Sequence, residues 1–429
     1  MSITYAGITE TSLRGISEPS KDGRPAIPER LMWKLWKRRA ARQDEFRTGA
    51  GARIRVLYPG RAGTSAGPDF RDALLDVEGF GLVRGDVELH LRQRDWDAHG
   101  HGNDPNYNGV VIHGALEIDS PETGLHSGTS APVVSLSGLV DEPDDDDSAT
   151  LEDTQVASTL WDMLAHRGYS RPGSAAEAGA LLARAGDERF GRKAAMLARF
   201  AAEQGPEQTL YEALMEGLGY RHNQQPFVKL AQAVPIAALR RAALPVLAEQ
   251  RPMVLRHWLL AVSGLADGAS AAPSRLPPGL GPVMERKQWH LFRVRPANHP
   301  AARIEGAADL VARFLERGLL SGLAEAAGSP SQLITALTVE GRKGGAAPIG
   351  AGRARDLAVN AVLPLLHSLE GNADSPYLAL CRRFPKLQGN EVVREMAEQL
   401  LPEQWRPEVN SARRQQGLLH LAALLRGGA

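Results

Sequence analysis

An acidic run at residues 141–153 is the feature that most constrains how this chain of 429 residues can fold. The segment reads DEPDDDDSATLED, with a proline and no apolar periodicity. A hydrophobic core cannot accommodate so many carboxylates, so we expect an acidic linker and a domain boundary there. The length agrees with this division, because a chain of this size usually forms at least two domains.

The residues before the acidic run predict a small α/β core over 27–140. Residues 28–46 carry apolar side chains at helical spacing behind a proline, which favours the first turn of a helix. Residues 1–26 lack periodicity and are expected to form a loosely ordered lead-in. Four short segments rich in Val, Leu and Ile, each bounded by Gly or Pro, predict a small sheet: 53–58, 70–77, 82–91 and 109–118.

The residues after the acidic run, 154–429, predict a helical domain. Apolar residues recur there at helical spacing between Gly and Pro stops, in the segments 154–168, 175–186, 192–205, 206–219 and 306–328. No repeat period emerges, so we expect helices packed on helices rather than a solenoid. The predicted fold class is therefore α+β, with a small N-terminal mixed α/β sheet domain followed by a mostly α-helical C-terminal domain.

Composition restricts the function classes. Fifty basic and fifty acidic residues leave no net charge, which argues against binding nucleic acid by bulk electrostatics, although a local basic patch would keep nucleic acid as a partner. The single cysteine, Cys381, excludes an internal disulfide and a cysteine-rich zinc site. The sequence has no targeting segment at its start and no run of about 18 apolar residues, which predicts a cytoplasmic protein without a membrane partner.

The segment 82–91 carries the first candidate site. The strand period of two places Glu88 and His90 on one face and the apolar residues between them on the other. Asp69 begins the preceding strand, and a hairpin through residues 78–81 would bring it next to Glu88. Adjacent carboxylates repel each other unless a cation lies between them, and oxygen ligands favour Mg²⁺ or Mn²⁺. We therefore expect Asp69 and Glu88 to bind a catalytic divalent metal, with His90 orienting a water molecule.

The order of these elements resembles the PD-(D/E)xK nuclease superfamily. A helix that begins with an acidic residue (Glu29) is followed by a strand, by Pro-Asp, and by Glu-x-His on the next strand. The resemblance implies a metal-dependent nuclease or phosphodiesterase that acts on nucleic acid. The superfamily pattern ends in Lys where this chain has His90, an exchange that favours a more pH-dependent activity or a non-enzymatic scaffold that binds nucleic acid or protein. Alternatively, Glu88 and His90 merely line the hydrated face of an antiparallel sheet.

A cluster of histidines forms a second candidate site. Four of the 12 histidines fall within residues 90–113: His90, His99, His101 and His113. With a carboxylate they could bind Zn²⁺, manganese or iron, as in a cupin-like barrel that acts on a small molecule. Asp95 and Glu29 are candidates either for hydrogen bonds to the metal ligands or for an alternative role as ligands. In the simpler interpretation, these histidines cap turns of a Gly- and Asn-rich loop or face solvent.

Longer motifs identify a family. GPDF, GDVELH, DWDAHGHGNDPNYNGVVIH, GYRHNQQPF and RVRPANHPAARI occur in this order, and with them the chain resembles the bacterial family catalogued as domain of unknown function 2851. The resemblance covers most of the chain and implies no activity. Family positions that it implies include Asp69, Glu88, His90, Asp95, Trp96, His99, His101, Tyr107, His113, Asn298, Arg303, Asn360 and Gln416.

The motif RVRPANHPAARI adds candidate substrate contacts in the helical half. Arg295, Asn298 and Arg303 could present hydrogen-bond donors to a phosphate or a carboxylate. In the alternative interpretation, the arginines form internal salt bridges that fix the start of a helix.

Overall fold

The computed structural model describes residues 29–40, 45–49, 51–63, 67–141, 149–219, 223–266, 276–291, 294, 296–341, 345–371 and 375–425. The chain divides into two compact units, residues 1–171 with 423–429 and residues 172–422. The first contains the sheet and the second is helical, which confirms the predicted α+β class. The predicted lead-in lies outside the described residues, as do residues 142–148 of the predicted acidic linker, whereas residues 149–153 begin helix α4 (Ala149–Ala165).

The N-terminal unit contains a mixed eight-stranded sheet with the order β1-β2-β4-β5-β6-β8-β7, in which β3 pairs with β4. β2, β4 and β5 are antiparallel, whereas β6 runs parallel to β5 and to β8. The strands are β1 (Phe46–Arg47), β2 (Arg53–Tyr58), β3 (Arg61–Ala62), β4 (Phe70–Val77), β5 (Gly81–Arg92), β6 (Val110–Glu117), β7 (Glu122–Gly124) and β8 (Ser130–Ser135). The helices are α1 (Glu29–Arg39), α2 (Asp95–Ala98), α3 (Ser137–Asp141), α4, and the 3₁₀ turns η1 (His101–Asn103) and η2 (Pro105–Tyr107).

Sequence periodicity locates the central strands and misses the short ones. β2 and β4 have the predicted bounds, and β5 and β6 agree with their predictions to within one residue. β7 and β8 are unpredicted because their segments contain Gly, Pro and Ser, which are typical of turns. The parallel pairs β5–β6 and β6–β8 show that the cupin-like barrel is wrong as a fold, since a cupin is an antiparallel jelly roll.

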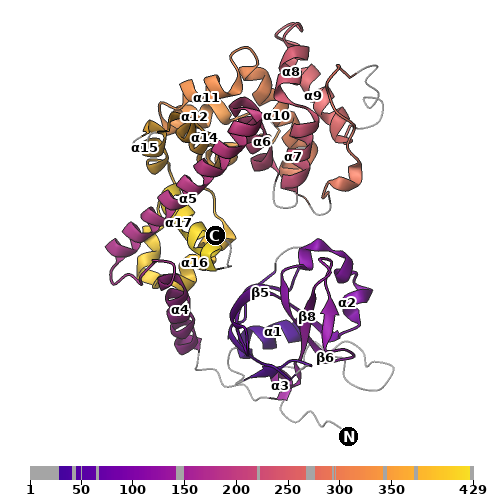
Figure 1. The fold of residues 1–429 in the computed structure, drawn as a ribbon, viewed down its shortest axis with the longest axis vertical. Coiled ribbons are helices and arrows are strands. Elements are labelled where there is room, and N and C mark those ends of the chain that lie inside the picture. Colours follow the sequence, from indigo (N-terminus) through magenta and orange to yellow (C-terminus); the bar gives the residue numbers. More distant parts are fainter. Residues whose placement is uncertain are drawn as a thin grey trace. The chain divides into compact units, whose positions relative to one another are not determined.

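Helix α1 covers the apolar face of the sheet (Figure 1). Met32 and Trp36 are buried, and the Trp36 ring lies 5.6 Å from Phe46 between centroids. Its indole nitrogen donates a hydrogen bond of 2.8 Å to the carbonyl of Pro59, so the ring buries apolar area with its one donor satisfied. Burial of this face leaves the opposite face of β5 for polar groups.

A β-bulge in β4 determines the face on which Asp69 lies. Phe70 and Ala73 pair with strand positions only two residues apart on β5, so β4 holds one extra residue between them. Asp72, within the bulge, adopts a left-handed φ of 58°, and its N–H donates to Asp86 Oδ1 at 3.1 Å. Because of the extra residue, both Phe70 and Ala73 pack in the core, and Asp69 falls on the polar face.

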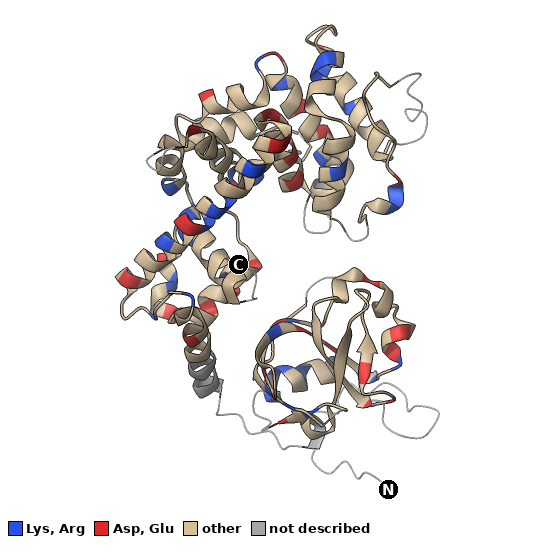
Figure 2. Ribbon diagram, in the orientation of Figure 1, with Lys and Arg blue, Asp and Glu red and all other residues tan. Residues whose placement is uncertain are grey.

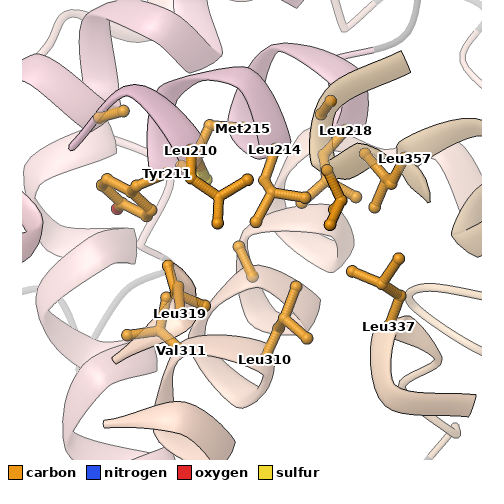
Figure 3. Packing of buried hydrophobic residues seen from close by; sticks show 14 of the residues in the cluster. Leu210, Tyr211, Leu214, Met215, Leu218, Leu310, Val311, Leu319, Leu337 and Leu357 are labelled. Carbon is orange, nitrogen blue, oxygen red and sulfur yellow. The ribbon is translucent and has the colours of Figure 1, made fainter. Parts of the chain in front are cut away.

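The helical unit packs most of its α-helices around one large core. In Figure 3, leucines of α6 face Leu310 and Val311 of α10, with Leu319, Leu337 and Leu357 around them. The α-helices are α5 (Ala175–Gln204), α6 (Pro206–Leu218), α7 (Gln224–Ala233), α8 (Ile236–Ala243), α9 (Arg251–Ser263), α10 (Pro300–Phe314), α11 (Leu319–Ala326), α12 (Pro330–Leu337), α13 (Ala351–Leu357), α14 (Leu363–Glu370), α15 (Pro376–Arg382), α16 (Glu391–Leu400) and α17 (Ala412–Leu425). Shorter turns are η5 (Arg286–Gln288), η6 (Pro296–Asn298), the π-helical η8 (Ala358–Val362) and η9 (Glu403–Glu408).

The segments 175–186 and 192–205, predicted as two helices, form the single helix α5. Gly186 does not end a helix. It is buried, and a Cβ there would overlap the carbonyl oxygen of Arg413, so this glycine permits close packing of α5 on the segment that begins α17. No helix within the described ranges is long and apolar enough to span a bilayer.

Leu210 tests the core of the helical unit. Its side chain is fully buried, so Leu210→Ala should lower the free energy of unfolding by about 2–5 kcal/mol in urea denaturation, through lost transfer energy and the cavity that remains. Leu247, which is 60% exposed, is the control: Leu247→Ala should change the free energy by less than about 0.5 kcal/mol. Equal effects of the two substitutions would contradict this packing.

Candidate metal centre

The polar face of β5 and the turn after α2 bring one carboxylate and three imidazoles together. Glu88 and His90 lie on β5, His99 follows α2, and His101 begins η1. The ligand atoms of the three histidines all lie within 4.8 Å of one another. We call these four residues the His–Glu cluster.

Distances in the His–Glu cluster suit a bound ion. His90 Nε2 lies 3.2 Å from His99 Nδ1, and Glu88 Oε1 lies 3.2 Å from His101 Nε2. Ligands about 2.1 Å from a tetrahedrally coordinated ion are about 3.4 Å apart, close to both spacings. The three histidines could therefore hold a metal ion, and Glu88 Oε1 lies beside them, 3.2 Å from His101 Nε2 and 3.9 Å from His90 Nε2.

Local sequence explains how the two loop histidines reach β5. Trp96 of α2 is buried and donates a hydrogen bond of 3.2 Å to the carbonyl of Gly124, which anchors the short helix. Gly100 then adopts a left-handed φ of 75°, a conformation that favours glycine and reverses the chain after α2. The reversal places His99 and His101 on either side of one turn. His101 stacks on Tyr107 at 4.0 Å between centroids with an interplanar angle of 27°.

Burial increases from the loop toward the sheet. His99 is exposed and His101 half-buried, whereas Glu88 and His90 are 4% and 2% exposed. The interpretation of Glu88 and His90 as a hydrated sheet face is therefore wrong. His99 is thus the exposed member of the cluster, whereas Glu88 and His90 are shielded from water, a gradient that suits a partly shielded ion.

The buried histidines are held neutral. Burial, reinforced by the neighbouring histidines, lowers the pKa of His90 to about 3, and burial with the charge of His101 lowers that of His113 to about 4. Neutral imidazole is the form that binds metals. The sequence suggested a pH-dependent activity because histidine usually changes charge near neutral pH. Burial moves the pKa of His90 far below neutral pH, so His90 is not the source of such a dependence.

A chain of hydrogen bonds behind the cluster orients His90. His90 Nδ1 lies 2.9 Å from His113 Nε2, and His113 Nδ1 lies 2.8 Å from the Thr123 hydroxyl. Gln93 Oε1 accepts two backbone N–H groups, from residues 119 and 120, so its amide nitrogen faces Thr123 Oγ1 at 3.3 Å. If His90 Nδ1–H donates to His113 Nε2, then His113 Nδ1–H donates to the Thr123 hydroxyl. The lone pair of His90 Nε2 then points into the cluster.

Asp69 and Glu88 lie side by side, as the hairpin predicts. The Asp69 N–H donates to Glu88 Oε2 at 2.8 Å, and the Leu89 N–H donates to Asp69 Oδ2 at 3.0 Å. These bonds confirm the predicted approach of the two residues. They leave Glu88 Oε1 turned toward the histidines, so the carboxylate site and the histidine site, expected as alternatives, share Glu88 and His90. A ligand role for Asp69 stays a prediction.

Arg71 is a neighbour of the cluster that the sequence analysis missed. Gly67 has a φ of 118°, and a Cβ there would overlap the Arg71 guanidinium, so this glycine makes room for the arginine. Burial is the main cause that raises the pKa of Tyr107, followed by the charges of Glu88, Asp104 and Asp69. The charge of Arg71 acts in the opposite direction and lowers this pKa. Arg71 therefore lies within electrostatic reach of the same hydroxyl as the carboxylates. Its position two residues after Asp69 was the available clue.

Other predicted site residues have different surroundings. Asp95 lies in the first turn of α2, and in the described part of the chain no hydrogen bond joins its side chain to the cluster. Glu29 begins α1, but its side chain and Arg295 lie outside the described residues.

Arg303 and Asn298 belong to the helical unit and bind each other. Arg303 is 7% exposed, and its guanidinium donates to Asn298 Oδ1 and to the carbonyl of Pro348, each at 2.6 Å. These bonds fix the start of α10, as the alternative interpretation expected, although neutral acceptors replace the expected salt bridge. A substrate-binding role for the two residues stays a prediction.

Thr123 provides a test of the orienting chain. Thr123→Val removes the hydroxyl that fixes His113, and loss of such an outer-shell partner typically weakens metal binding 10- to 100-fold. Competition for Zn²⁺ with a chromophoric chelator measures the change. Thr129→Val is the matched control, because that exposed hydroxyl bonds to Ser127 outside the orienting chain, and its loss should leave the affinity unchanged. Equal affinities of the two variants would show that the chain does not orient a ligand.

Acid stability tests the neutral histidines. The pKa of His113 is lowered from 6.5 to about 4, so the unfolded chain binds a proton that the folded chain excludes, and stability present above pH 6.5 is lost as the pH falls toward 4. In metal-free buffer, His113→Gln should show a smaller loss of unfolding free energy between pH 6.5 and 4 than the unmodified protein. An identical pH profile in urea denaturation would contradict the lowered pKa.

Comparisons with known proteins identify the family. Comparison with curated proteins and with solved structures found no significant match. A family model described as "Protein of unknown function (DUF2851)" matches residues 29–269, which is more than half of the chain and includes every residue of the His–Glu cluster. The chain therefore belongs to the DUF2851 family.

Proposed function

We propose that the N-terminal unit is a metal-dependent hydrolase that cleaves phosphodiester bonds in nucleic acid. The observation that carries the proposal is the convergence of Glu88, His90, His99 and His101 on one partly exposed place. A bound ion would supply a water molecule of lowered pKa at this place. The protein would supply the ligands, hold His90 neutral and restrict access to the side of His99.

The ligand types favour a transition metal over Mg²⁺. Imidazoles suit zinc and iron, whereas carboxylates suit magnesium and manganese. In our proposal the three imidazoles therefore favour Zn²⁺, and the carboxylate keeps Mn²⁺ as the second candidate, whereas two carboxylates were expected to favour Mg²⁺ or Mn²⁺. Asp69 is then an additional acidic group next to Glu88, hydrogen-bonded to the backbone of β5.

The topology supports a phosphodiester as the substrate. Helix α1 and the antiparallel strands β2, β4 and β5 follow in the order that the resemblance to PD-(D/E)xK nucleases implies. Asp69 precedes β4, and Glu88 and His90 lie on β5. His90 stands where that superfamily has a lysine, but a neutral imidazole cannot supply a positive charge. We assign that charge to Arg71, whose guanidinium suits a phosphate group.

Cleavage assays with defined metals test the proposal. Protein stripped with a chelator and reloaded with Zn²⁺, Mn²⁺ or Mg²⁺ is incubated with single- and double-stranded DNA and with RNA. Zn²⁺ or Mn²⁺ should restore cleavage. Glu88→Gln and His99→Ala should each lose at least about 100-fold in rate, since a ligand of the ion is removed. His126→Ala is the control, because this exposed histidine lies outside the cluster and its loss should leave the rate unchanged.

Three results would count against the proposal. Cleavage that is equal in Glu88→Gln and in the unmodified protein would come from a contaminant or another site. Metal binding without cleavage of DNA or RNA would favour the small-molecule enzyme that the histidines also suit. Absence of both metal binding and cleavage would favour a non-enzymatic scaffold.

A further inference from the structure

Two cations on one face of α5 border a small cavity in the helical unit. Arg189 and Lys193 are one helical turn apart, and the cavity that they line has a volume of about 10 Å³. Cys381, Arg413 and Gln416 are among its other lining residues. Figure 2 shows the basic positions along α5.

The hydrogen-bond partners of both cations are neutral. Arg189 Nε donates to Gln416 Oε1 at 2.8 Å, and Lys193 Nζ donates to Asn360 Oδ1 at 2.8 Å. Burial lowers the pKa of both side chains, and the nearby charge of Arg189 helps to lower that of Lys193 to about 8. Two desolvated cations thus repel each other while each contacts an amide oxygen that carries no full charge.

The acidic residue beside the cavity is already engaged. Asp187 accepts hydrogen bonds from Arg413 at 2.7 and 2.5 Å and from Arg382 at 2.9 Å. Among the residues that line the cavity, three are cationic and Asp187 is acidic. Glu216 and Asp356 attract Lys193 electrostatically, and neither is its hydrogen-bond partner in the described part of the chain. Charges withdrawn from water usually have a counter-charge in contact, whereas within the described residues the side-chain hydrogen bonds of Arg189 and Lys193 go to amide oxygens.

A π-helical turn fixes the group that faces Lys193. Asn360 lies in η8, and its amide nitrogen donates to the carbonyl of Asp356 at 2.9 Å, which turns its oxygen toward Lys193. Such turns occur frequently at functional sites. Asn360 and Gln416 are thereby placed as hydrogen-bonding walls beside the two cations.

We propose that Arg189 and Lys193 bind an oxyanion, a phosphate or carboxylate group, whose oxygen enters this cavity. A volume of about 10 Å³ accommodates one water-sized atom, so one oxygen enters and the rest of the group lies outside. The oxyanion would supply the counter-charge that the guanidinium and ammonium groups lack, as in other phosphate sites. The site lies entirely within residues 172–422 and does not depend on the proposed hydrolase.

Calorimetric titration of the full chain with inorganic phosphate tests the site, in a buffer without other oxyanions. The unmodified protein should bind phosphate and gain thermal stability with it, since a ligand of the folded state stabilises that state. Lys193→Met and Arg189→Met should each lose at least about tenfold in affinity. Arg192→Met is the control on the same helix, because Arg192 is exposed and does not line the cavity, and it should bind phosphate like the unmodified protein.

A stability measurement separates binding from a structural role. Without oxyanions, Lys193→Met should melt at or above the temperature of the unmodified protein, because the substitution removes a desolvated charge. Acetate and a 12-nucleotide single strand serve as further ligands, and competition with phosphate by the strand would identify the nucleic-acid backbone as the source. Absence of stabilisation by phosphate and by acetate, or a lower melting temperature of Lys193→Met with unchanged phosphate affinity, would overturn the proposal.

Discussion

The antiparallel pairing of β4 with β5 sets the position of the groups in the candidate metal centre. It places the backbone of Asp69 against the Glu88 carboxylate, which receives the Asp69 N–H at 2.8 Å and keeps its other oxygen for the histidines. The bulge at Asp72 is part of the same pairing. A strand without the extra residue would put Asp69 on the core side beneath α1, because side chains alternate between the two faces. The strained left-handed backbone of Asp72 is therefore a condition for the polar face to be assembled.

Periodicity was sufficient to predict the central strands, the polar face of β5 and the approach of Asp69 to Glu88, because these depend on neighbours in one hairpin. It could not predict that the carboxylates and the histidines share a site, since that depends on Gly100 reversing the chain after α2. The orienting chain was also out of reach, because Thr123 lies on a three-residue strand that no pattern marks. In the helical half, glycine suggested a helix stop at residue 186, whereas there it serves close packing.

The two units withdraw polar groups from water in different ways. In the N-terminal unit the imidazoles lose their charge, and their hydrogen bonds run inward through His113 to Thr123. In the helical unit Arg189 cannot lose its charge under ordinary conditions, and Lys193 would do so only with a pKa near 8. Neutral nitrogen ligands suit a cation, and crowded cations suit an anion. The same desolvation thus favours opposite kinds of ligand in the two units.

The resemblance to PD-(D/E)xK nucleases implies a lysine at the position of His90, and burial gives a physical reason for a histidine there. A lysine so deeply buried beside three other histidines would have to lose its proton or find a counter-charge, whereas an imidazole is neutral there and has a second nitrogen for His113. In the proposed function, the positive charge that faces the phosphate then has to come from a group nearer the surface. Arg71 is half-buried and lies against Gly67, and its charge acts on the same Tyr107 hydroxyl as the charges of Glu88 and Asp69. In the proposed function, His90 is therefore a ligand of the ion, and Arg71 supplies the positive charge.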